Sequence, residues 1–169
     1  MTAPAGRAAL DIRRDDLTGE AMQSLLRLHL EAMHANSPPG SAFALDLSGL
    51  QASSVTLWSV WIEDALAGMG ALKALAQGHG EIKSMRTHPA FLRRGVAAAL
   101  LYHIIAEAGR RGITRLSLET GSGPAFEPAL ALYRRRGFVE GDPFADYVRS
   151  DFNRFLHLDF APGTGQPAS

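Results

Sequence analysis

The segment that most constrains the fold is residues 81–119, in which a strand, a helix and a second strand follow one another. The helix is expected over residues 96–111, because apolar side chains recur there every three to four positions and Gly112 then ends the pattern. Residues 81–87 and 113–119 are the flanking strands. Two neighbouring strands joined through a helix run parallel, because the helix returns the chain to the end at which it started. The sequence therefore predicts a central β-α-β crossover.

The strands expected around this crossover are mostly antiparallel. Residues 55–62 are rich in β-branched and aromatic side chains, and Glu63-Asp64 can turn the chain into a strand at residues 66–75. Shorter strands are predicted at residues 10–12, 138–140 and 155–160, and helices at residues 17–34 and 128–136, with a helical turn at residues 47–51. The predicted fold class is α/β, of the α+β type: a mixed, mostly antiparallel sheet of about six or seven strands flanked by helices.

The length of 169 residues suits one domain. We expect this domain over residues 8–160, with residues 1–7 and 161–169 as flexible tails rich in small residues and proline. No apolar run approaches the roughly 18 residues of a membrane span. Residues 1–6 lack the basic and apolar regions of a signal peptide. A cytoplasmic protein that does not associate with membranes is therefore expected.

The formal net charge is zero, but the charges are unevenly distributed. Residues 1–82 carry five basic and nine acidic side chains, residues 83–136 carry ten and three, and residues 137–169 carry two and five. The three segments therefore have net charges of −4, +7 and −3. The overall balance argues against a nucleic-acid partner, whereas the basic middle segment favours an anion bound at one place.

The loop before the long helix has the properties of a phosphate site. Small residues at Gly95 and Ala97 let a ligand approach the backbone, and a helix start offers free N–H groups and a positive dipole end. Arg93 and Arg94 add positive charge at the same place. The alternative is a glycine turn flanked by two solvated arginines.

Two motifs in this region resemble those of the GNAT superfamily of N-acetyltransferases. The strand, loop and helix around Gly95 and Ala97 are similar to motif A of that family. Residues 129–138, A-L-A-L-Y-R-R-R-G-F, match its motif B, A-x-x-L-Y-x-x-x-G-F. The order of predicted elements also agrees, so the resemblance extends over residues 8–160. The wider sequence is similar to a bacterial subgroup of these acetyltransferases.

The resemblance implies acetyl-CoA as cosubstrate and no metal ion. In the family, the pantetheine arm pairs with the strand that precedes motif A, which would place it beside Met85, Arg86 and Thr87. The pyrophosphate would lie on the N–H groups of the loop and helix start, formed by Arg93, Arg94, Gly95, Val96, Ala97 and Ala98. Two usual side-chain contacts are replaced, a Gln or Arg by Leu92 and an Asn by Phe126.

Tyr133 is the candidate catalytic acid. It matches the motif B tyrosine, which in the family lies near the CoA sulfur and can protonate the departing thiolate. A phenol with an ordinary pKa near 10 can do this. The alternative is a packing role, because Leu130 and Tyr133 share one helix face.

Glu81 is the candidate base that deprotonates the amine. It lies fourteen residues before Gly95, the spacing of the base in histone-type members of the family. The alternation of a strand places Glu81, Lys83 and Met85 on one face. The alternative is an ion pair between Glu81 and Lys83. Asp146, Glu119 and His88 are weaker candidates.

The resemblance implies transfer of an acetyl group from acetyl-CoA to a primary amine, and we expect that amine to belong to a small molecule. Cysteine is absent, which excludes disulfides, thiolate metal sites and an acetyl-cysteine intermediate, so direct attack in a ternary complex is expected. The acidic flanking segments favour a cationic acceptor, which Asp146 and Tyr147 could hold. A sensor that binds acetyl-CoA without turnover is the alternative, and a homodimer remains open.

Overall fold

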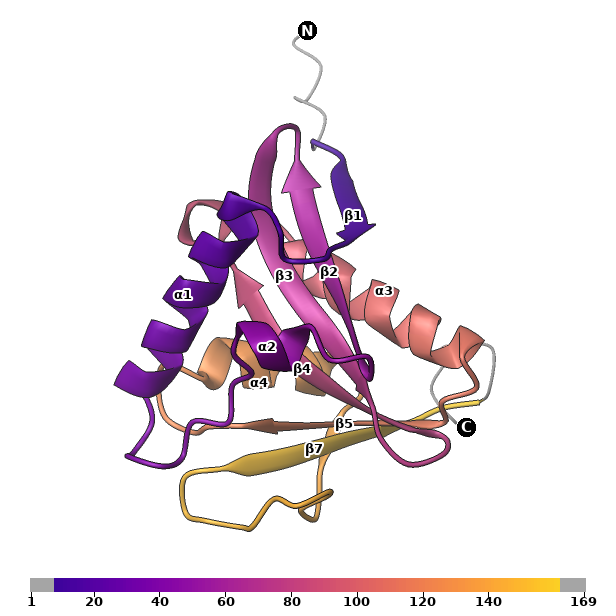
Figure 1. Cartoon of the computed structure of the whole chain (residues 1–169). Coiled ribbons are helices and arrows are strands. Elements are labelled where there is room, and N and C mark those ends of the chain that lie inside the picture. Colours follow the sequence, from indigo (N-terminus) through magenta and orange to yellow (C-terminus); the bar gives the residue numbers. More distant parts are fainter. Residues whose placement is uncertain (1–7, 162–169) are drawn as a thin grey trace, which may run out of the picture.

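The computed structural model describes residues 8–161, which form one seven-stranded sheet with helices on both faces (Figure 1). The strand order is β1-β2-β3-β4-β5-β7-β6. The strands are β1 (Leu10–Arg14), β2 (Val55–Ile62), β3 (Ala65–Ala74), β4 (His79–Thr87), β5 (Arg115–Thr120), β6 (Val139–Glu140) and β7 (Arg154–Asp159). The helices are α1 (Glu20–Ala35), α2 (Leu47–Leu50), the 3₁₀ helix η1 (Pro89–Phe91), α3 (Val96–Arg110) and α4 (Glu127–Arg135). The expected tails, residues 1–7 and all but Ala161 of residues 161–169, lie outside the described residues.

The topology confirms the predicted fold class. Each neighbouring pair of strands is antiparallel except β4 and β5, which run parallel and are joined through α3. Helix α1 begins at Glu20 rather than at the predicted Leu17. The backbone at Leu17 is left-handed, with φ of 63°, and its N–H donates to Asp15, so the chain is still turning there. No helix within residues 8–161 is long and apolar enough to cross a membrane.

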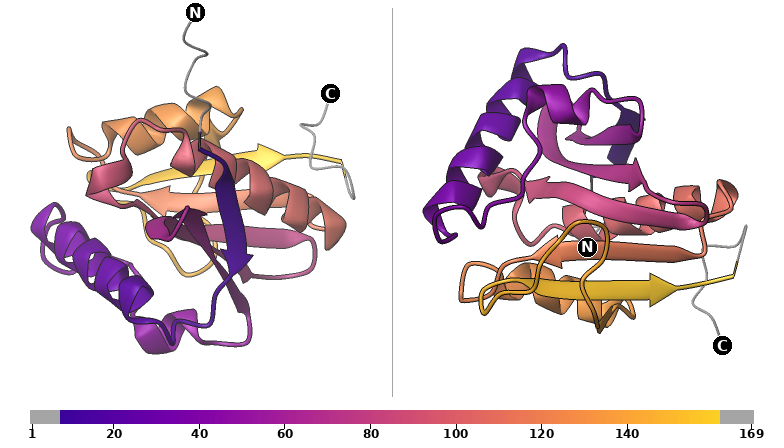
Figure 2. Two further views of the ribbon diagram at one scale, coloured as in Figure 1. Left: turned by 90° about the horizontal axis from the view of Figure 1, so that it is seen from above. Right: turned by 60° about the horizontal axis from the view of Figure 1, so that its bottom comes forward.

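The helices cover the sheet from two sides. Helices α1 and α2 lie on one face and α3 and α4 on the other (Figure 2). The core under α1 and α2 includes Leu25, Leu57 and Met69, and the larger core under α3 and α4 includes Leu101 and Leu116. Both faces of the central strands are therefore buried, which explains why their sequences lack a clean alternation of polar and apolar residues.

A bulge in β4 changes which of its side chains face α1. Between Lys83 and Arg86 the pairing advances three residues on β4 but only two on β3, and Ser84 has φ of 57°. The extra residue reverses the alternation that follows it. The expectation that Glu81, Lys83 and Met85 share one face is therefore wrong. Met85 packs toward α3, whereas Arg86 joins Lys83 on the face of α1.

Strands β4 and β5 separate after a short paired stretch. They pair only from His79 to Glu81, opposite Arg115 to Ser117. Beyond this point they diverge, as Figure 1 shows, and the rest of β4 has no partner on that side. The sheet is thus open at its centre, next to the crossover that the sequence predicted.

Candidate functional site

A cavity lies where β4 and β5 diverge. It contains about 870 Å³ of empty space, part of which is open to solvent. Its walls come from α1, the loop between α1 and α2, both diverging strands and α4. Because β4 and β5 are both in the middle of the sheet, the cavity extends toward each face.

The free edge of β4 forms one wall of the cavity. Ile82, Met85 and Arg86 line the cavity, and residues 82–87 have no pairing partner on β5. Unpaired backbone N–H and C=O groups at a strand edge can hydrogen-bond an extended ligand as an additional strand would. Met85, Arg86 and Thr87 lie on this free edge of β4.

The start of α3 provides free backbone donors. Gly95 is the N-cap residue with a left-handed φ of 79°, and no side chain caps the helix. The first bond back to the cap comes from the N–H of Ala99 to the Gly95 carbonyl, so the preceding N–H groups, those of residues 96–98, have no partner within the helix. Arg93 also has a positive φ, of 62°, and Arg94 lies over the Phe91 ring. This geometry suits a phosphate group.

The two positions at which the sequence departs from the family pattern lie apart. Leu92 is 58% exposed and contributes no polar group. Phe126 is buried at the start of α4, lines the cavity and packs edge-to-face with Phe152, with 5.5 Å between ring centroids. An apolar ring therefore lies at the position where the family pattern usually has the amide side chain of an Asn.

Tyr133 lines the cavity from α4. Its ring packs edge-to-face on Phe138 with 5.6 Å between centroids, so it also contributes to the core. Burial raises the pKa of its hydroxyl well above the ordinary value. Tyr133 is therefore protonated at neutral pH and can donate a hydrogen bond to a group in the cavity.

Glu81 is buried beside Lys83 and Tyr147 and is not part of the cavity wall. Its Oε2 accepts a hydrogen bond of 2.7 Å from the Tyr147 hydroxyl and lies 3.5 Å from Lys83 Nζ. Lys83 Nζ also donates to the Tyr147 hydroxyl at 2.8 Å. The ion pair that was the alternative to a base role is thus present. Burial and the Glu81 carboxylate raise the pKa of Tyr147.

Glu119, ranked below Glu81 from the sequence, does line the cavity from β5. Burial is the main cause that raises the pKa of its carboxyl to about 7; Glu81 adds to the increase and Lys83 opposes it. Its Oε2 is buried without a hydrogen-bond partner among the described residues. The alternation along β5, which turns Ser117 and Glu119 to the same face, is the sequence signal that could have favoured it.

The other candidates from the sequence are not part of the cavity wall. Asp146 is exposed in the loop before β7. His88 accepts a hydrogen bond from the Ala90 N–H and caps η1. Tyr147 is held by Glu81 and Lys83. Within residues 8–161, no group of three or more His, Asp or Glu side chains has the arrangement of a metal site.

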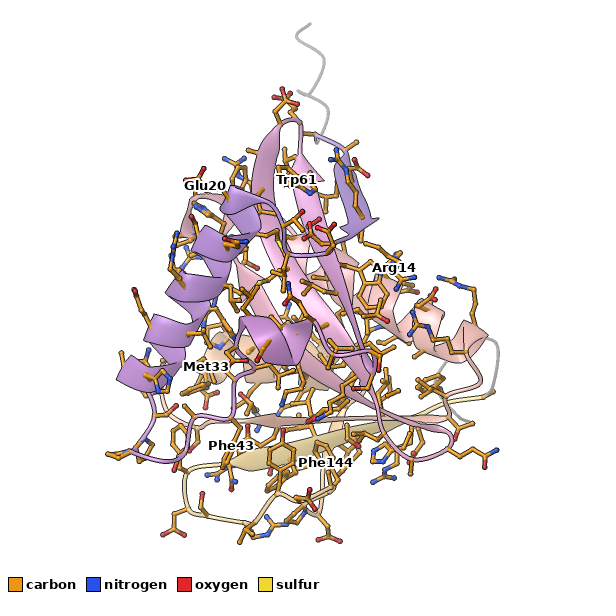
Figure 3. The ribbon with its side chains drawn as sticks, in the orientation of Figure 1. Arg14, Glu20, Met33, Phe43, Trp61 and Phe144 are labelled. Atoms are coloured by element: carbon orange, nitrogen blue, oxygen red, sulfur yellow. The ribbon has the colours of Figure 1, made fainter. Side chains whose placement is uncertain are left out.

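Arg86 and His29 form the polar part of the wall on the α1 side. Arg86 Nε donates to His29 Nδ1 at 3.0 Å, and both residues line the cavity. Burial, with a smaller contribution from Arg86, lowers the pKa of His29 to about 3. His29 is therefore a neutral acceptor for the arginine. Met33 and Phe43, labelled in Figure 3, add an apolar surface beside this pair.

Comparisons with known proteins agree with this geometry. The model of the acetyltransferase (GNAT) family matches residues 20–138. The uncharacterized N-acetyltransferase YsnE of Bacillus subtilis is 54% identical over 147 residues, covering 87% of this chain and 97% of its own. The uncharacterized N-acetyltransferase YedL of Escherichia coli is 47% identical over 156 residues, covering 92% and 98%. A Bacillus subtilis acetyltransferase solved in complex with CoA is 20% identical, with a TM-score of 0.67 over 90% of this chain and 100% of that one.

Proposed function

Because the chain belongs to the acetyltransferase (GNAT) family and is therefore an acyltransferase, we propose that it transfers the acetyl group of acetyl-CoA to a primary amine of a small molecule. The observation that supports this best is the cavity between β4 and β5, which combines the free edge of β4 with Tyr133 and Glu119. A strand edge, a proton donor and a proton acceptor are the groups that such a transfer needs.

The residues present fit acetyl-CoA as the cosubstrate. The free edge of β4 at Met85, Arg86 and Thr87 would pair with the pantetheine arm. The pyrophosphate would be held by the loop and helix start formed by Arg93, Arg94, Gly95, Val96, Ala97 and Ala98. Backbone N–H groups supply most of this binding, so it does not depend on the side chains that Leu92 and Phe126 replace. That a protein of the same fold was solved with CoA supports the assignment.

Glu119 is the base in this proposal. A primary amine is protonated at neutral pH and must lose a proton before its nitrogen can attack. A carboxyl with a pKa of about 7 accepts protons most effectively near that pH. Glu81 is the alternative base, and it could act on the cavity only through the Tyr147 hydroxyl that it holds.

Tyr133 is the acid. The amine nitrogen forms a bond to the acetyl carbon, the carbon–sulfur bond breaks with its electron pair going to sulfur, and the Tyr133 hydroxyl gives its proton to that sulfur. The attacking nitrogen still carries one proton too many after the new bond forms, and it loses that proton to the Tyr133 phenolate, which restores the phenol. Glu119 passes the proton that it took from the ammonium group to solvent, so one proton is released per turnover. The chain has no cysteine that could hold the acetyl group, which supports direct attack with both substrates bound.

A thiol-release assay tests the proposal. The protein is incubated with acetyl-CoA and a panel of amino acids, polyamines, aminoglycosides and peptides, and free CoA thiol is measured together with the acetylated product. We expect one class of small amines to release thiol well above the rate without acceptor. Absence of acetylated product with every member of the panel, in a protein that binds acetyl-CoA, would favour the non-catalytic sensor.

A further inference from the structure

The cavity contains a cation without a counter-ion. The bulge at Ser84 turns Arg86 toward α1, where it lines the cavity and donates through Nε to His29. Among residues 8–161, no carboxylate forms an ion pair with Arg86, and its two Nη groups have no hydrogen-bond partner. Neither Nη group is fully enclosed by protein. The open part of the guanidinium is thus available to a ligand.

This arrangement is unfavourable unless an anion binds. Burial lowers the pKa of Arg86, and no nearby carboxylate opposes that effect, yet a guanidinium stays protonated in proteins. His29 cannot balance the charge, because its imidazole is neutral. A partly buried charge without a partner costs free energy that a bound anion would recover.

The other charged groups around the cavity limit the kinds of ligand that could bring an anionic group to Arg86. Lys83 is balanced by Glu81, with Tyr147 bonded to both. Glu119 and Arg86 are therefore the two cavity groups whose charges no ion pair compensates. They have opposite signs. A purely cationic acceptor, which the acidic flanking segments suggested, would place positive charge beside Arg86.

Part of the cavity wall on the α1 side is apolar. Met33 on α1 and Phe43 on the following loop line the same cavity, and Figure 3 shows both on the α1 side of the sheet. Phe43 is fixed by edge-to-face packing on Tyr147, with 5.4 Å between centroids. This wall can contact an apolar side chain of a ligand whose anionic group is at Arg86.

We propose that the acceptor is a small amino carboxylate with an apolar side chain, and that Arg86 binds its carboxylate while its amine faces Glu119. The inference rests on the proposed function and names its substrate class. A guanidinium binds a carboxylate through two parallel hydrogen bonds, a geometry that lysine does not reproduce. Arg86 therefore determines acceptor specificity through its side chain, separately from the backbone contact of β4 with the cosubstrate.

Matched acceptors that differ only in the carboxylate test this proposal. L-methionine is compared with L-methioninamide, and L-phenylalanine with L-phenylalaninamide, by kcat/KM for acetylation. We expect the wild-type protein to favour each acid over its amide by roughly 10- to 100-fold, the effect of hydrogen bonds to a charged group. In Arg86→Gln this preference disappears, mainly through a higher KM for the acid. Arg86→Lys restores part of it, and Arg13→Gln, an exposed arginine on β1, leaves it unchanged.

Equilibrium binding provides a readout that does not need turnover. Heats of binding of the same four compounds are measured for the CoA-bound protein, and melting curves verify that both Arg86 variants are folded. Wild-type protein that binds or acetylates the amides as well as the acids would overturn the inference, as would an unchanged acid preference in Arg86→Gln. Acetylation of cationic amines without any acid preference would overturn this inference alone, whereas absence of turnover with every amine would count against the proposed function.

Discussion

At the scale of single residues, two carboxylates on one face of the sheet have environments that suit different tasks. Glu81 accepts a hydrogen bond from the Tyr147 hydroxyl and lies 3.5 Å from Lys83 Nζ, so its carboxylate is held by two partners. Glu119 has a buried oxygen without a donor and a pKa raised to about 7. Two neighbouring acids with such different surroundings usually have different roles. We therefore propose Glu119 as the base, while Glu81 holds Lys83 and Tyr147 in place.

Replacing Glu119 with Gln tests its role through the pH dependence of the rate. A base acts when it is deprotonated, so wild-type kcat is expected to rise with pH and to level off above about 7. In Glu119→Gln, kcat falls by roughly 10²–10⁴ and this rise disappears. Steady-state rates between pH 5 and 9 measure both effects. A rise retained in Glu119→Gln but lost in Glu81→Gln would identify Glu81 as the base instead.

Replacing Glu81 with Gln is expected to destabilise the fold. Lys83 is only 9% exposed and would lose its single carboxylate partner. Breaking one side of a buried ion pair costs about 3–5 kcal/mol. Urea unfolding monitored by circular dichroism measures the change. The double variant Glu81→Gln with Lys83→Met should recover much of the stability; a single variant as stable as wild type would show that the pair contributes little.

Removing only the Tyr133 hydroxyl separates catalysis from packing. In Tyr133→Phe the ring keeps its contact with Phe138, 5.6 Å away, so stability should change by less than about 1 kcal/mol. If the hydroxyl protonates the leaving sulfur, kcat falls by roughly 10²–10⁴. Single-turnover rates and melting curves give the two quantities. An unchanged rate would assign Tyr133 to packing.

At the scale of elements, the sequence predicted regular segments well because their signals are local. Strand β2 has its predicted bounds, residues 55–62, and α3 ends one residue before its predicted end. In both segments, side-chain type and spacing decide the structure within a few residues. The central crossover and the mostly antiparallel sheet followed from the same local signals together with the resemblance to a family.

The arrangement of the candidate site was less predictable, because it depends on one inserted residue and on distant contacts. The bulge at Ser84 reverses the alternation of β4, so that Arg86 rather than Met85 shares the face of Lys83. Tyr147 reaches Glu81 from 66 residues away. Only the structure shows that Glu81 is bonded to Lys83 and Tyr147, and that Glu119 rather than Glu81 lines the cavity.

The contact between β3 and the start of α3 provides a test at this scale. A Cβ added at Gly68 would lie 2.8 Å from Val96 Cγ1 and 3.1 Å from the Arg86 carbonyl oxygen. The methyl group added in Gly68→Ala would therefore displace β4 or the start of α3, the two elements that we propose bind acetyl-CoA. We expect a loss of about 1–3 kcal/mol in stability and a higher KM for acetyl-CoA. Chemical unfolding and initial rates measure these changes.

Gly19→Ala is the matched control for this substitution. Gly19 precedes α1, has a φ of −80°, and an added Cβ there would have no atom within 4 Å. Its stability and KM should be close to those of wild type. Equal behaviour of the Gly68 and Gly19 variants would show that the β3–α3 contact is not tightly constrained.

At the scale of the whole molecule, the positive charge of residues 83–136 separates into two groups. Five of its ten basic side chains form ion pairs: Lys83, Arg110, Arg111, Arg115 and Arg134. Within residues 8–161, the other five have no ion pair: Arg86, Arg93, Arg94, Arg135 and Arg136. They lie on the cavity wall, before α3 and at the end of α4. Within residues 83–136, three cations without an ion pair, Arg86, Arg93 and Arg94, thus lie on the cavity wall and directly before α3.

Binding of acetyl-CoA is expected to stabilise the whole fold, because a ligand that binds only the folded protein shifts the unfolding equilibrium toward it. A ligand at 100 times its Kd adds about 2.7 kcal/mol to the free energy of unfolding, which for a chain of this size corresponds to a rise in Tm of roughly 5–10 °C.

The double variant Arg93→Gln with Arg94→Gln should require roughly tenfold more acetyl-CoA for the same rise, because charged contacts to phosphate are lost. The charge-matched control, Arg13→Gln with Arg14→Gln on β1, should behave like wild type. Scanning calorimetry over a series of acetyl-CoA concentrations measures all three proteins. No rise at millimolar acetyl-CoA would contradict the proposed cosubstrate, whereas an equal rise in all three would show that the backbone N–H groups at the start of α3 hold the phosphates without help from the two arginines.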